Sequence, residues 1–201
     1  MDITHVFFDI GGVLGTNGWD REQRARAVEH FGLDGEFEQR HFELAGDWEV
    51  GRITIDEYLD SAVFYTPRPF SREELVAFMM AQSEPYSESL LIVEDLRARR
   101  PDLRLMTLNN ESAELNNHRI GYFGLRPLFS AFLSSCWLGV RKPSRAMFER
   151  GLSVAQAEAA RAVFVDDREQ NLAPARALGF QTVHFTGADA LEKALTDLRL
   201  L

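Results

Sequence analysis

The second half of the chain alternates between short, almost continuous apolar runs and segments with helical periodicity. Apolar runs of this kind are typical of parallel strands that are buried on both faces. A similar run, THVFFD (4–9), stands near the start of the chain. The later runs are LRLMTLN (103–109), FSAFLSS (129–135), AVFVD (162–166) and QTVHF (181–185).

The segments between these runs carry apolar residues at helical spacing. Leu172, Ala175 and Leu178 recur at i, i+3 and i+6, and a similar stripe begins at Leu191. Strands that alternate with helices predict an α/β fold with a doubly wound, Rossmann-like parallel sheet and right-handed crossovers.

The stretch between residues 16 and 85 contains helical patterns and no convincing strand. Two capping boxes mark helix starts within it, one formed by Thr54 and Glu57 and the other by Ser71 and Glu74. A helical block directly after the first strand indicates an inserted cap.

We therefore expect two domains. Residues 1–15 and 86–201 would form the α/β core, and residues 16–85 would form the helical cap.

Composition and charge narrow the range of functions. The 201-residue chain is 45% hydrophobic, which is enough for a well-filled core, and it carries a net charge of −9. Such a surface repels phosphate backbones, so we expect no nucleic-acid partner. An anionic substrate would need a local positive site. Cys136 is the only cysteine, which excludes an intramolecular disulfide.

The sequence predicts a cytoplasmic location. The start, MDITHVFFD, lacks a basic leader, and no apolar window approaches the ~20 residues of a membrane span. We expect no membrane partner.

Polar side chains follow the apolar runs, at the points where the predicted strands end. In an open parallel sheet, ligands bind beyond the carboxyl ends of the strands. Three carboxylates, two amides and two cations would therefore meet at one edge. They are Asp9, Asn109, Asn110, Arg141, Lys142, Asp166 and Asp167.

This set of groups favours phosphoryl transfer. An exposed carboxylate such as Asp9 can attack phosphorus and form an aspartyl-phosphate. Mg²⁺ prefers oxygen ligands, and Asp9 with the Asp166–Asp167 pair offers them. Lys142 and the amides would offset the remaining phosphate charge.

These residues also carry a family resemblance. FFDIGGVL, TLNN, GVRKP and VFVDD followed by REQNLAPARALGF resemble, in order, the four motifs of the haloacid dehalogenase (HAD) superfamily. The resemblance is to the group with an α-helical cap inserted after the first motif, and it spans essentially the whole chain. It implies a Mg²⁺-dependent phosphomonoester hydrolase that acts on a small phosphorylated metabolite.

The resemblance also implies roles for individual residues. Asp9 would be the nucleophile and a metal ligand, and the residue at Gly11 would bind Mg²⁺ through its backbone carbonyl. Asp167 would bind the metal directly, and Asp166 would do so directly or through water.

Three further residues would contact the transferring phosphate. Lys142 would hold Asp9 and the phosphoryl oxygens. Asn110, or Asn109 where the family usually has Ser or Thr, would hydrogen-bond the phosphate.

Gly11 departs from the usual first motif, which has a second aspartate there. That aspartate serves as general acid and base, a contribution typically worth about 10²–10⁴ in rate. Some capped members of the superfamily resemble this chain in having a DxG motif. The missing acid also admits two alternatives. One is a 2-haloacid dehalogenase that uses Asp9 without a metal, and the other is a non-catalytic binding protein.

Two other groups of polar residues have weaker claims. His41, Asp47, Trp48 and Glu49 cluster in the predicted cap, where they would select a substrate or replace the missing acid if they faced the core. His118 and Arg119 follow the second motif, and we expect them to face solvent.

Overall fold

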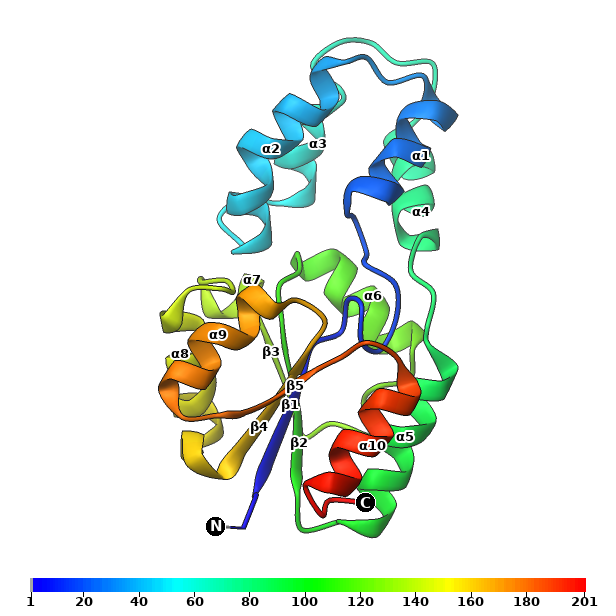
Figure 1. Ribbon diagram of the computed structural model, residues 1–201. Helices are drawn as coiled ribbons and strands as arrows, with labels where there is room; N and C mark the ends of the chain where they lie inside the picture. Colours follow the sequence, from blue (N-terminus) through cyan, green and yellow to red (C-terminus); the bar gives the residue numbers. More distant parts are fainter. Residues whose placement is uncertain (1) are drawn as a thin grey trace.

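Five parallel strands form a single sheet in the order β3-β2-β1-β4-β5 (Figure 1). The computed structural model describes residues 2–201. The strands are β1 (His5–Phe8), β2 (Arg104–Asn109), β3 (Ala131–Ser134), β4 (Ala162–Asp166) and β5 (Gln181–His184). Each strand lies inside one of the apolar runs of the sequence, and its ends are within two residues of the ends of that run. The predicted doubly wound α/β fold is therefore confirmed.

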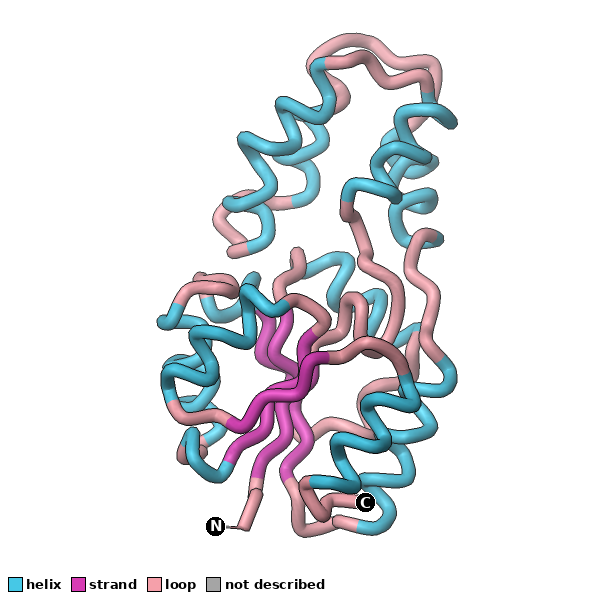
Figure 2. The backbone as a smooth tube through the Cα atoms, in the orientation of Figure 1, coloured by secondary structure: helices cyan, strands magenta, loops and turns pink. Residues whose placement is uncertain are grey.

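Side chains on β1, β2 and β4 alternate between two buried faces, which explains why their runs are almost continuously apolar. Val6 and Phe8 pack toward α5 (Ser87–Arg99) and α10 (Ala188–Asp197), whereas Phe7 packs toward α8 (Arg145–Ala155) and α9 (Glu169–Leu178). Figure 2 shows the sheet between these helix layers. The core helices are α5 (Ser87–Arg99), α6 (Ala113–Tyr122), α7 (Ser135–Leu138), α8 (Arg145–Ala155), η1 (Ala159–Arg161), α9 (Glu169–Leu178) and α10 (Ala188–Asp197).

Four helices between β1 and α5 form a separate body beyond the carboxyl ends of the strands (Figure 1). Both predicted capping boxes are present, at Thr54 and at Ser71, and each begins a helix. The helices have their own apolar cluster, which includes Phe37, Tyr58 and Leu75. They are α1 (Arg21–Phe31), α2 (Glu36–Glu49), α3 (Ile55–Ala62) and α4 (Arg72–Ala81). Within residues 2–201, no helix is both long and apolar enough to cross a membrane.

The two segments that join this helical body to the core run side by side. The Thr16 N–H donates to the Glu84 carbonyl at 2.9 Å, and the Tyr86 N–H donates to the Leu14 carbonyl at 2.9 Å. The Thr16 hydroxyl also donates to the Gln82 carbonyl. We propose to divide core from cap at this paired connection, between residues 15 and 16 and between 85 and 86.

Candidate active site

Three carboxylates meet at the carboxyl ends of β1, the central strand, and its neighbour β4. Asp9 directly follows β1, Asp166 is the last residue of β4, and Asp167 comes next. One oxygen of each lies within 4.8 Å of an oxygen of the others. Because β1 and β4 are neighbours in parallel register, the chain brings these acids together by topology alone.

Lys142 provides the positive charge inside this cluster. Its Nζ lies 2.9 Å from Asp9 Oδ2 and 2.7 Å from Asp166 Oδ2, and its side chain is 1% exposed. The loop that carries Lys142 is held by Asn110. The Lys142 N–H donates to Asn110 Oδ1 at 2.8 Å, and Asn110 Nδ2 donates to the Lys142 carbonyl at 2.9 Å. The second motif therefore positions the lysine of the third.

The two adjacent aspartates have different surroundings. Both oxygens of Asp166 already accept hydrogen bonds, from Lys142 Nζ, the Arg168 N–H and Asn171 Nδ2. Asp167 Oδ1, in contrast, is a buried oxygen without a hydrogen-bond partner in the described chain. A buried oxygen normally has a partner. Asp167 is therefore the better placed of the two to bind a ligand directly.

The charges of the cluster do not balance. Burial raises the pKa of Asp9 to about 7, against the lowering effect of Lys142, and Asp166 adds to the rise. Burial and the neighbouring Asp166 also raise the pKa of Asp167. Three carboxylates and one ammonium leave an excess of negative charge on oxygen atoms, which fits a divalent cation such as Mg²⁺.

The loop after Asp9 approaches the cluster closely. Gly12 has φ of +74°, and a Cβ added there would lie 2.3 Å from Asp167 Oδ2. Only glycine meets both conditions without strain. At Gly11, an added Cβ would lie 2.8 Å from Asn17 Oδ1, which is the end of a side chain that can move.

The two predicted phosphate-binding amides lie in different places. Asn110 lines the pocket, but its side-chain amide is hydrogen-bonded to the Lys142 backbone. Asn109 is 1% exposed, and its Nδ2 donates to Asn116 Oδ1 at 2.9 Å. Their contact with a phosphate stays a prediction.

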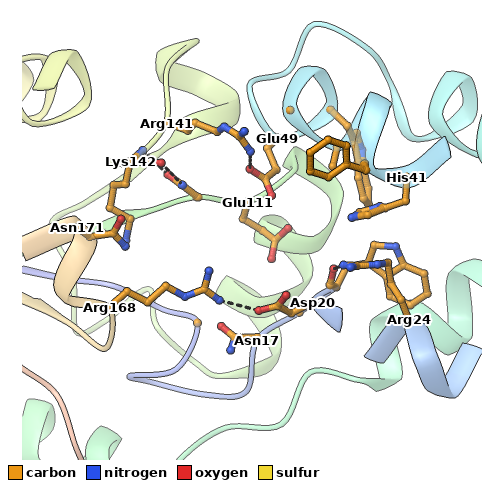
Figure 3. Close-up of a pocket in the computed structure, with 18 of the residues that line it drawn as sticks. Asn17, Asp20, Arg24, His41, Glu49, Glu111, Arg141, Lys142, Arg168 and Asn171 are labelled. Atoms are coloured by element: carbon orange, nitrogen blue, oxygen red, sulfur yellow. Dashed lines mark hydrogen bonds and ion pairs between the residues drawn. The ribbon is translucent and has the colours of Figure 1, made fainter. Parts of the chain in front are cut away.

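A cavity of about 630 Å³ lies between the cluster and the cap. Two ion pairs join its walls, as Figure 3 shows. Arg168 of the core pairs with Asp20 at the start of α1 at 2.6 Å, and Arg141 pairs with Glu49 at the end of α2 at 2.7 Å. The cavity is therefore lined by both parts of the chain, with Asp9 and Lys142 at its core side. We call it the active-site pocket.

One prediction from the sequence is wrong. Arg119 does not face solvent but is 1% exposed, and its Nη1 lies 3.1 Å from Glu111 Oε2. Its Nη2 donates to the Thr16 carbonyl. Both members of this buried pair line the active-site pocket. Glu111 is a pocket residue that the sequence did not predict. A signal for Arg119 does exist, because it stands four residues after Leu115 on the buried stripe of α6.

The polar cluster of the cap divides into packing and ion-pair residues. Trp48 stacks on Tyr58 with ring centroids 4.3 Å apart, and His41 Nδ1 lies 2.8 Å from the Tyr58 hydroxyl. Burial and nearby Arg24 lower the pKa of His41 to about 4, so this ring is neutral at pH 7. Asp47 pairs with Arg52. All four residues of the cluster line the pocket, and Glu49 pairs there with Arg141 of the core.

Comparisons with known proteins identify the family. The family model described as haloacid dehalogenase-like hydrolase matches residues 3–179. The match covers most of the chain, and the protein belongs to this family of hydrolases.

Two curated proteins are similar to the chain. It is 28% identical over 231 residues to bifunctional epoxide hydrolase 2 of Sus scrofa, with all of the chain and 40% of that protein covered. It is 27% identical over 162 residues to drimenol cyclase drtB of Aspergillus calidoustus, with 79% of the chain and 30% of that protein covered. The chain thus spans less than half the length of these relatives.

Solved structures show the same fold. A predicted HAD-like family hydrolase from Porphyromonas gingivalis has a TM-score of 0.80 and 22% identity, with 99% of this chain and 98% of that chain covered. A HAD family enzyme from Bacteroides thetaiotaomicron, in complex with magnesium and inorganic phosphate, has a TM-score of 0.74 and 22% identity over 90% and 92%. L-2-haloacid dehalogenase from Xanthobacter autotrophicus has a TM-score of 0.62 and 19% identity over 97% and 83%.

Proposed function

We propose that this haloacid dehalogenase-like hydrolase is a Mg²⁺-dependent phosphomonoesterase that acts on a small phosphorylated metabolite. The observation that carries the proposal is the cluster of Asp9, Asp166 and Asp167 around the buried Lys142 ammonium. Asp167 has a buried oxygen without a partner among the described residues, which supports a metal ligand there. The magnesium and phosphate complex of the similar Bacteroides enzyme supports the same assignment.

The surroundings of Asp9 suit a nucleophile. The Ile10 N–H donates to Asp9 Oδ1 at 2.8 Å, and Lys142 holds Oδ2, so the carboxylate is fixed in one orientation. Its side chain is 11% exposed and lines the pocket. In the proposed reaction, an Asp9 oxygen bonds to phosphorus while the ester bond to the leaving oxygen breaks. Water then attacks the aspartyl-phosphate, which releases phosphate and restores Asp9.

The other groups bind and orient. Asp9, Asp167 and the Gly11 carbonyl would hold Mg²⁺, with Asp166 acting mainly through Lys142. The metal would neutralise phosphoryl oxygens and hold the phosphate for in-line attack. Lys142 would contact the same oxygens, while the cap keeps bulk water away from the pocket. Asn110 holds the lysine loop and would hydrogen-bond the phosphate from the same side.

Turnover of p-nitrophenyl phosphate tests the proposal, because its aryl leaving group hardly needs a proton. We expect turnover with Mg²⁺, and none with EDTA or in the Asp9→Asn variant. Asp197→Asn, on the exposed face of α10, is the matched control and should retain activity. Folded protein that shows no turnover under any condition would refute the proposal.

A second candidate is a 2-haloacid dehalogenase. Gly11 favours it, because it leaves Asp9 as the single acid of the first motif. The solved L-2-haloacid dehalogenase of similar fold supports it as well. Halide release from 2-chloropropionate, unaffected by EDTA, would support this candidate over the phosphatase. The paired acids Asp166 and Asp167 count against it, because without a cation they would repel a carboxylate substrate.

A further inference from the structure

A carboxyl group sits in the centre of the active-site pocket without an assigned role. Glu111 stands two residues after β2, and Figure 3 shows it between Glu49 and Asp20 of the cap side. Its side chain is only 10% exposed, yet it lines the pocket. Oε1 accepts from the Ser112 N–H at 3.0 Å, and Oε2 accepts from Arg119 Nη1. The carboxyl is therefore fixed in place.

The Glu111–Arg119 pair lies beside the position at which the first motif lacks an acid. A Cβ added to Gly11 would lie 3.8 Å from Arg119 Nη1. A Cβ added to Gly18 would lie 2.7 Å from Glu111 Oε2 and 3.5 Å from Arg119 Nη1. Gly18 therefore leaves room for the Glu111 carboxyl, and a side chain at residue 11 would be in van der Waals contact with Arg119. A carboxyl from another element is thus paired with the arginine that a residue-11 side chain would meet.

Glu111 has the acidity that proton transfer at neutral pH needs. Burial raises its pKa to about 7, although Arg119 lowers it, and Glu49 of α2 adds to the rise. Arg119 is faced in turn by Asp9 and Tyr86. A group with a pKa near the working pH can both give and take a proton.

Other acids of the pocket are less suited to this task. Asp20 is bound to Arg168, Glu49 to Arg141, and Glu38 to Arg24. The three carboxylates belong to the cap side, and each is at least 31% exposed. Among the acids named, Glu111 combines burial with a place on the core.

We propose that Glu111 is the proton donor and acceptor of the reaction, in the role that Gly11 does not fill, with Arg119 as its positioning residue. This inference rests on the proposed phosphatase function. When Asp9 bonds to phosphorus and the ester bond breaks, the carboxyl proton of Glu111 passes to the leaving oxygen, which departs as an alcohol. The Glu111 carboxylate then takes a proton from the water that attacks the aspartyl-phosphate. Phosphate, free Asp9 and protonated Glu111 result.

The Glu111→Gln variant tests the proposal on two substrates in Mg²⁺. With β-glycerophosphate, whose alkoxide must be protonated, we expect kcat/KM to fall by about 10²–10⁴. With p-nitrophenyl phosphate we expect kcat/KM to stay within about tenfold, because the aryl oxygen leaves unprotonated. Hydrolysis of the aspartyl-phosphate would still lack its base. A burst of p-nitrophenolate followed by slow turnover should therefore appear.

Glu38→Gln is the matched control, since it removes another pocket acid that is paired with an arginine. It should change both kcat/KM values by the same factor and give no burst. Adding Gly11→Asp to Glu111→Gln should restore β-glycerophosphate turnover at least tenfold. The Cβ of that aspartate would meet the end of the Asn17 side chain, which can move. Equal losses on both substrates without a burst, in folded Glu111→Gln, would overturn the proposal.

Two further variants separate a failure of this proposal from structural effects of the substitution. Glu111→Gln leaves the Arg119 charge buried without its partner, so the Glu111→Gln, Arg119→Gln double variant provides a second protein without the carboxyl. Gly11→Asp alone keeps Glu111, and it should raise β-glycerophosphate turnover less than tenfold, because the role is already filled. A hundredfold gain in β-glycerophosphate turnover would show that Glu111 does not fill this role. Wild-type protein without Mg²⁺- and Asp9-dependent turnover would instead refute the proposed function.

Discussion

Replacing Lys142 by methionine is the sharpest test of the charge cluster. The chain has two lysines, Lys142 and Lys193, so the same substitution at the second is a matched control. Lys142 Nζ contacts Asp9 and Asp166, and its side chain is 1% exposed. Lys193 pairs with Asp197 across one helical turn and is 75% exposed. Methionine keeps the length and apolar stem of both side chains.

The expected magnitudes follow from this difference in burial. Removing one partner of a buried ion pair costs about 3–5 kcal/mol, because the remaining charge is left without compensation. Two carboxylates lose their partner here, so we expect Lys142→Met to reach that range in EDTA. An exposed pair at i, i+4 contributes only about 0.3–0.5 kcal/mol, so Lys193→Met should change little.

The free energy of unfolding that Lys142→Met loses relative to the wild type should also depend on pH. In the wild type the pKa of Asp9 is raised to about 7 from 3.8, so its contribution to stability falls as pH rises toward 7 and is constant above. Without the Lys142 ammonium, the pKa of Asp9 rises further, and stability keeps falling above pH 7. The free-energy difference between wild type and Lys142→Met should therefore widen from pH 7 to pH 9.

Urea unfolding followed by tryptophan fluorescence measures these quantities at each pH, with the slope of the transition as a check that the same surface is exposed. If Lys142→Met lost less than about 1 kcal/mol, or matched Lys193→Met, the lysine would not hold the cluster together. A deficit that stayed constant across pH would refute the assignment of the unpaired charge to Asp9.

Three other substitutions test the surroundings of the site. Gly12→Ala should lower the free energy of unfolding by about 1–3 kcal/mol through its strained backbone, and by more through the contact with Asp167. Gly32 has φ of +61° and open space around it, so Gly32→Ala should show only the backbone effect. Equal urea midpoints for the two variants would contradict this. The pKa of His41 is lowered to about 4, so its stabilisation is complete above pH 6.5 and lost as pH falls toward 4. Wild type should then lose up to about 3 kcal/mol relative to His41→Gln, and parallel stability curves would exclude it. Ser71→Ala removes a helix cap and should lower the free energy of unfolding by about 1 kcal/mol, which a shift in Tm below 1 °C would contradict.

The sequence by itself determined the sheet and the residues at its edge. Almost continuous apolar runs predict parallel strands, and the carboxyl ends of such strands lie at one edge of the sheet. Asp9 after β1 and Asp166 in β4 could therefore be predicted to meet, although 156 residues separate them. The helical insertion followed from the same logic, since two capping boxes stand in a stretch without strands.

Only the tertiary structure decided which charged side chains pair with one another. The sequence predicted that Lys142 holds Asp9, but its second bond, to Asp166, depends on angstrom-scale packing. So do the hydrogen bonds that occupy Asp166, while an Asp167 oxygen is left without a partner among the described residues. The same is true of Glu111 and Arg119. A charged residue is exposed by default, and it is buried only where a partner from another element meets it. Strand topology follows from local patterns of hydrophobicity, whereas such a meeting depends on contacts between distant segments.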